Sequence, residues 1–71
     1  MLERLQQVIG KVFEVDSATV SARTVIRQLP GWDSLKHLKL IMAVETEFSR
    51  ELTPEQIESL KTVGDIAAVI V

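Results

Sequence analysis

The chain contains no cysteine, and in a sequence of only 71 residues this limits the possible folds more than any other feature. The core of so small a domain supplies roughly 3–5 kcal/mol of net stability, and many small domains add disulfides or a thiolate-bound metal to it. Neither is possible here, so apolar faces alone must hold the chain together. We expect a single domain spanning residues 1–71, too small to enclose a large catalytic cleft.

Apolar residues recur at helical rather than alternating spacing, which favours an all-α fold. The first helical face comprises Leu2, Leu5, Val8, Ile9, Val12 and Phe13. Asp16-Ser17 then predicts the end of this helix or a turn. A second helix should begin at Asp33 or Ser34, since both residue types are favoured N-caps. The residues that follow it at helical spacing, whose apolar members we expect to face the core, are Leu35, Leu38, Ile41, Met42, Glu45 and Phe48.

The remaining segments complete a bundle of three main helices and one short helix, with a long loop between the first two helices. Thr53, Pro54 and Gln56 predict a capping box that starts the short helix. Thr62 and Asp65 predict the start of the last helix, where the helix dipole favours an acid. Residues 15–33 form the long loop, with the expected core anchors Val15, Val20, Val25, Ile26 and Leu29.

Charge and hydropathy restrict the function classes. The net charge of −2 argues against non-specific nucleic-acid binding. Residues 1–40 carry six bases and four acids (+2), whereas residues 41–71 carry two bases and six acids (−4). No apolar run resembles a signal sequence or a membrane span, so we expect a soluble, unprocessed, cytoplasmic protein. The initial Met1 suggests a free-standing gene product.

The most informative stretch is Gly31-Trp32-Asp33-Ser34-Leu35, which opens the second helix after a loop. Glu45, Glu47 and Phe48 follow it, and Thr62-Val63-Gly64-Asp65-Ile66 follows later. Along essentially its whole length the chain resembles the acyl carrier proteins, which have Asp-Ser-Leu at the start of the second helix. The resemblance implies a carrier that holds acyl groups as thioesters on a 4'-phosphopantetheine arm from coenzyme A, without catalysis of its own.

The resemblance also implies roles for individual residues. Ser34 would be the attachment point, because an exposed hydroxyl at a helix start suits an anionic phosphodiester. Its alternative reading is a plain N-cap. Asp33 is expected to cap the helix, and contact with Mg²⁺ in the complex with the synthase is the secondary reading. No residue is assigned to catalysis or to a resident metal site.

Other residues near Ser34 have structural readings that we favour. Trp32 should be a partly buried plug that closes the loop over the bundle. His37 should be a solvated surface histidine, with contact to the phosphate or a partner as the alternative. Met42, Ala43 and Phe48 should pack in the core, where such residues could also shelter an acyl chain.

Two lysines depart from the family pattern. Fatty-acid carriers have acidic residues after Asp-Ser-Leu, whereas Lys36 and Lys39 stand there in this chain. We therefore hypothesise partners with an acidic or neutral rim beside the arm, and a basic rim near Glu45 and Glu47. The expected partner-binding residues are Leu35, Lys36, Lys39, Met42, Glu45 and Glu47. The alternative, which we weigh equally, is that these charged side chains form a solvated face and bind no partner.

The expected partners are a phosphopantetheinyl transferase and acyl-loading and acyl-processing enzymes of fatty-acid, polyketide or another specialised pathway. The specialised pathway is preferred because of the two lysines. We expect a monomer without nucleic-acid or membrane partners. Two alternatives remain at this point: an aminoacyl or peptidyl carrier, and a small helical adaptor that would use the apolar segment 66–71. A helix-turn-helix DNA binder is disfavoured by the net acidic charge.

Overall fold

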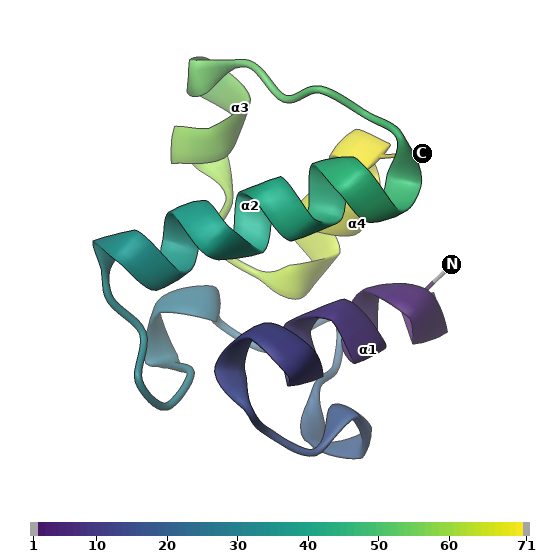
Figure 1. Ribbon diagram of the computed structural model, residues 1–71, viewed down its shortest axis with the longest axis vertical. Coiled ribbons are helices and arrows are strands. Elements are labelled where there is room, and N and C mark those ends of the chain that lie inside the picture. Colours follow the sequence, from purple (N-terminus) through teal and green to yellow (C-terminus); the bar gives the residue numbers. More distant parts are fainter. Residues whose placement is uncertain (1, 71) are drawn as a thin grey trace.

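The computed structural model describes residues 2–70, and it confirms the all-α bundle expected from the sequence. The helices are α1 (Leu2–Phe13), α2 (Ser34–Phe48), α3 (Pro54–Ser59) and α4 (Val63–Ile70). Two short 3-10 turns, Ser17–Thr19 and Ile26–Gln28, lie in the long connection between α1 and α2. α1 and α2 lie side by side and run in opposite directions (Figure 1). Within residues 2–70, no helix is both long enough and apolar enough to cross a membrane.

The helix starts predicted from the sequence are confirmed by their hydrogen bonds. The Asp33 side chain caps α2, and Thr53 and Gln56 form a complete capping box at α3. At α4, the carboxylate of Asp65 accepts the backbone N–H groups of Thr62 and Lys61, both at 2.9 Å. These bonds, that of Thr62 first, lower the pKa of Asp65 below its ordinary value of 3.8.

The core draws residues from α1, α2 and α4, from the long connection between α1 and α2, and from the residue that follows α3. Burial of these side chains is the main force that folds the chain. The last helix contributes Val63, Ile66 and Ile70, so the apolar C-terminal segment packs on the bundle rather than forming an exposed stripe. Val71 lies outside the described residues. The buried core residues are Leu5, Val8, Ile9, Phe13, Val20, Ile26, Leu29, Leu40, Ile41, Val44, Leu60, Val63, Ile66 and Ile70.

The long connection is fixed to the start of α4 by backbone pairing. Val25 and Thr62 form an isolated antiparallel bridge, and Gly64 N–H donates to Ala22 O at 2.9 Å. A Cβ on Gly64 would lie 3.0 Å from that same carbonyl, so this close approach favours glycine. The expectation that Val25 anchors the core is wrong: the residue stays 36% exposed, and its contribution to the fold is the backbone bridge to Thr62.

The expected orientation of α2 is wrong for three residues. Leu35, Leu38 and Met42 do not face the core; they are 62%, 54% and 65% exposed. The buried face is formed instead by Leu40, Ile41 and Val44, with Ala43 and Phe48 partly buried beside it. At about 100° per residue, positions 35, 38 and 42 fall on one side of the helix and positions 40, 41 and 44 on another. α2 therefore has apolar residues on two faces, and only one of them packs against the bundle.

Candidate functional site

Ser34 is the first residue of α2 and its side chain is exposed. The loop before it bends at Gly31, whose φ of 77° lies in the left-handed region that glycine adopts without strain. Asp33 then takes an extended conformation as the N-cap, so the helix begins at Ser34 itself. The chain therefore presents a primary hydroxyl to solvent at a fixed point on a rigid element, where another protein can reach it.

The start of α2 suits a negatively charged group on Ser34. The Asp33 carboxylate accepts the Lys36 N–H at 2.7 Å, and the Asp33 carbonyl accepts the His37 N–H at 2.9 Å. These bonds leave the backbone N–H groups of Ser34 and Leu35 at the open end of the helix, where unpaired donors and the helix dipole favour an anion. The open N–H groups beside the exposed Ser34 hydroxyl are therefore suited to the negative charge of a phosphodiester.

The capping role expected for Asp33 is confirmed by its bond to the Lys36 N–H. Its second expected role, contact with Mg²⁺ in a synthase complex, stays a prediction. Among residues 2–70, no group of three or more histidine or carboxylate side chains is positioned to hold a metal ion.

Trp32 and His37 lie on either side of Ser34 in the sequence, and their side chains contact each other. The indole N–H of Trp32 donates to Nδ1 of His37 at 3.3 Å, and the two rings meet edge to face at 5.8 Å. Trp32 is half-buried against the core, which confirms it as a plug of the loop. The expectation of a solvated His37 is wrong, because its ring is half-buried against this indole. The pair ties the end of the loop to the first turn of α2.

Lys36 is directed toward α1. Its ammonium group donates to the Val12 carbonyl at 2.9 Å and lies 5.9 Å from the centre of the Phe13 ring. Val12 is in the last turn of α1, where carbonyls lack helical partners and a cation is favourable. Lys36 therefore closes the end of α1 and joins it to the start of α2, so its charge is engaged within the chain.

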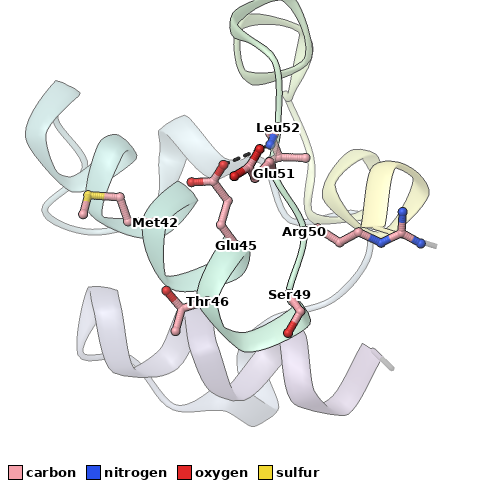
Figure 2. Close-up of a pocket in the computed structure, with 7 residues that line it drawn as sticks. All are labelled: Met42, Glu45, Thr46, Ser49, Arg50, Glu51 and Leu52. Carbon is pink, nitrogen blue, oxygen red and sulfur yellow. Dashed lines mark hydrogen bonds between the residues drawn. The ribbon is translucent and has the colours of Figure 1, made fainter.

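Both acids of α2 are also engaged within the chain. The Glu45 carboxylate accepts the Leu52 N–H at 2.9 Å, across a pocket between the end of α2 and the segment that leads to α3 (Figure 2). The Glu47 carboxylate pairs with Arg4 of α1 at 2.8 Å. Glu45 thus fixes the exit of α2, and Glu47 links the end of α2 to α1.

The remaining expected partner-binding residues lie together on the exposed side of α2. Leu35, Lys39 and Met42 are all exposed there. Sequence reasoning missed Leu38 as a member of this group because it assigned that residue to the core. The available signal was the excess of apolar residues on α2, which is more than one buried face requires.

Comparison with known proteins identifies the family to which the chain belongs. The family model for the phosphopantetheine attachment site matches residues 3–70. The acyl carrier protein of Helicobacter pylori (strain J99) is 37% identical over 70 residues, covering 99% of this chain and 90% of that protein. The chain belongs to the acyl carrier protein family. The acyl carrier protein of Helicobacter acinonychis also matches with 37% identity, covering 99% of this chain and 90% of that protein.

The fold agrees with this assignment. A solution structure of the holo acyl carrier protein of Geobacter metallireducens superposes with a TM-score of 0.85 at 30% identity, covering 97% of this chain and 79% of that one. Acyl carrier proteins are carriers rather than enzymes, and the attachment-site match means that the chain bears covalently attached phosphopantetheine. The exposed hydroxyl at the start of α2 suits such an attachment.

Proposed function

We propose that Ser34 is the residue that receives phosphopantetheine, and that this acyl carrier presents its cargo from the start of α2. The single observation that carries the proposal is the exposed hydroxyl at the first position of α2, beside the open N–H groups of that helix. When attached, phosphopantetheine supplies the thiol that the sequence lacks, and that thiol holds acyl groups as thioesters.

Transfer of phosphopantetheine from coenzyme A to the chain, which we call arming, uses the Ser34 hydroxyl as the nucleophile. Its Oγ attacks the phosphorus of coenzyme A that bears the pantetheine; an Oγ–P bond forms and the P–O bond of the pyrophosphate breaks. The leaving group is the adenosine part of coenzyme A, which carries its own 3'-phosphate and the second phosphate of the pyrophosphate, and the serine proton is released. The chain contributes position: the Asp33 cap and the Trp32–His37 contact fix the first turn of α2 on both sides of Ser34. A hydroxyl that is held in place costs a transferase less entropy to align.

The proposed partners are a phosphopantetheinyl transferase and the enzymes that load and process the acyl group. We also propose a specialised acyl pathway rather than general fatty-acid synthesis. Support comes from the exposed Lys39, which stands where fatty-acid carriers have an acid. A tether on a small domain lets one thioester reach several enzymes, at high effective concentration while each is docked.

Intact mass spectrometry tests the attachment site. The purified chain is incubated with coenzyme A, Mg²⁺ and a broad-specificity phosphopantetheinyl transferase. We expect the mass of the chain to increase by that of one phosphopantetheine group. Ser34→Ala should abolish the addition. Ser59→Ala is the matched control, because Ser59 is also an exposed serine on a helix, and it should be armed like the unmodified sequence.

Two results would refute the proposal. One is an unarmed chain under conditions that arm another acyl carrier protein, and the other is an armed Ser34→Ala variant. Fluorescence of Trp32, the only tryptophan, and circular dichroism check that each variant is folded.

A further inference from the structure

The imidazole of His37 is directed toward the start of α2. Side chains on a helix lean toward its N-terminus, so each residue covers the turn before it. The ring of His37 does so, because it contacts Trp32, which lies five residues earlier on the loop. Ser34 lies three residues before His37, a spacing that places two side chains on one helical face with their Cβ atoms about 5–6 Å apart. The imidazole is therefore a close neighbour of any group attached to the Ser34 oxygen.

The contact with Trp32 decides which nitrogen of the neutral imidazole carries the proton. An indole N–H can only donate a hydrogen bond. It donates to Nδ1 of His37 at 3.3 Å, so Nδ1 carries the lone pair and the proton lies on Nε2. Within residues 2–70, Nε2 has no hydrogen-bond partner. Trp32 thus leaves His37 with one free N–H donor on a ring that is held in place and half-buried.

The charged groups around the Trp32–His37 pair are engaged with other parts of the chain. The Asp33 carboxylate accepts the Lys36 N–H, and the Lys36 ammonium group donates to a carbonyl of α1. On the loop, the guanidinium of Arg27 lies 5.6 Å from the centre of the Trp32 ring. Of the polar side chains on the first turn of α2, that of His37 is therefore the one with a donor left for Ser34.

We propose that His37 binds the phosphodiester of the armed chain by donating its Nε2–H to a phosphate oxygen, and that Trp32 is the positioning residue that keeps the proton on Nε2. This inference rests on the proposed function, because it requires the phosphodiester on Ser34. The imidazole adds a side-chain donor to the open backbone N–H groups of Ser34 and Leu35. A hydrogen bond to an ionised oxygen is stronger than one between neutral groups. The bond gives the first part of the arm a preferred direction, while the part beyond the phosphate stays free to move.

Phosphorus NMR of the armed chain tests the contact with His37. A phosphodiester keeps its single charge between about pH 5 and 7, whereas histidine is the residue type that titrates in this range. His37 is the only histidine of the chain, so a change of the phosphorus chemical shift over this range reports the imidazole. We call this change the pH step. We expect the pH step in the folded armed chain, and we expect its loss in the urea-unfolded armed chain and in armed His37→Gln.

Matched variants of His37 distinguish its two nitrogens. The side-chain amide of glutamine can replace Nε2–H as a donor, whereas the shorter asparagine places its amide near Nδ1. At neutral pH, His37→Gln should keep the phosphorus resonance of the armed chain close to that of the unmodified sequence. His37→Asn should move it toward its position in the unfolded armed chain. Arg27→Gln removes a nearby cation that does not carry the proposed bond, so it should leave the pH step in place.

The role of Trp32 is measured on the imidazole itself. Long-range proton–nitrogen NMR spectra distinguish a proton on Nε2 from one on Nδ1. We expect the neutral imidazole of the unmodified chain to carry its proton on Nε2, both before and after arming. Trp32→Phe keeps an aromatic ring on the loop but lacks the N–H donor, so both tautomers should appear and the pH step should become smaller. Circular dichroism checks that each variant is folded.

Each outcome decides the proposal. An armed chain without a pH step, or equal phosphorus shifts in His37→Gln and His37→Asn, would overturn the role of His37 and leave the carrier function intact. An unchanged tautomer in Trp32→Phe would overturn the role of Trp32. If excess transferase arms neither His37 variant, the imidazole is required for transfer itself, and a role confined to holding the phosphate is refuted. Failure of the unmodified chain to be armed at Ser34 would overturn this inference and the proposed function together.

Discussion

Two leucines on α2, two residues apart, should respond very differently to the same substitution. Leu40 is fully buried and Leu38 is 54% exposed. The pair isolates burial as the variable, because both residues lie inside the same helix and both would be replaced by alanine. We expect Leu40→Ala to destabilise the fold severely and Leu38→Ala to leave it nearly unchanged.

The magnitudes follow from the area that each side chain buries. Leucine exceeds alanine by about three methylene equivalents, each worth about 0.8 kcal/mol when buried, and a cavity adds to this loss. Leu40→Ala should therefore cost about 2.5–5 kcal/mol. Leu38→Ala loses about half of the transfer term, creates no enclosed cavity, and regains a little from the higher helix propensity of alanine. Its cost should be about 1 kcal/mol or less.

Urea unfolding followed by circular dichroism and by Trp32 fluorescence provides the measurement. The whole domain is expected to have only about 3–5 kcal/mol of stability, so Leu40→Ala should leave little folded protein. Val44→Ala, at another fully buried position of α2, is the milder companion and should cost about 2–3 kcal/mol. If Leu38→Ala destabilises the chain as much as Leu40→Ala, the assignment of the two faces of α2 is refuted.

Two further predictions concern the ends of helices. Glu14 follows α1 with a φ of 56°, so Glu14→Gly should stabilise the fold by about 0.5–1 kcal/mol in urea unfolding. Gln7→Gly, inside α1, should instead destabilise the fold by about 1 kcal/mol. A loss of stability in both variants would contradict the argument. Hydrogen bonds, that of the Thr62 N–H first, lower the pKa of Asp65 below 3.8. A lowered folded-state pKa means that this stabilisation is present above pH 3.8 and is lost as the pH falls through the folded value. Asp65→Asn should remove that part of the pH dependence, and an unchanged pH profile would count against it.

Local sequence signals predicted the helix starts well. The side chains of Asp33, Thr53 and Thr62 form the expected capping bonds, because a cap depends on residues only two to four positions apart. The resemblance to the acyl carrier proteins selected Ser34 as the candidate site, and its placement at a helix start follows from the same kind of local signal. A hydroxyl one residue after an N-cap lies at the start of a helix whatever the helix packs against, so the position of Ser34 followed from the local sequence.

The side of α2 that faces the core could not be predicted from the local sequence. Apolar residues occupy two faces of this helix, and either face alone could fill a core. Packing against α1 and burial in the common core select the side with Leu40, Ile41 and Val44, and leave Leu38 and Met42 exposed. His37 was placed incorrectly for a similar reason, because its neighbour in space is an indole on the preceding loop.

The sequence by itself determined the helical content, the caps, the absence of any protein thiol and the place of Ser34 at a helix start. These depend on residue type and short spacing, which a linear pattern records. Only the tertiary structure decided which charges of α2 are available: Lys36 binds α1 through Val12, whereas Lys39 reaches solvent. The physical reason is that availability depends on partners distant in the sequence, such as the carbonyl 24 residues before Lys36.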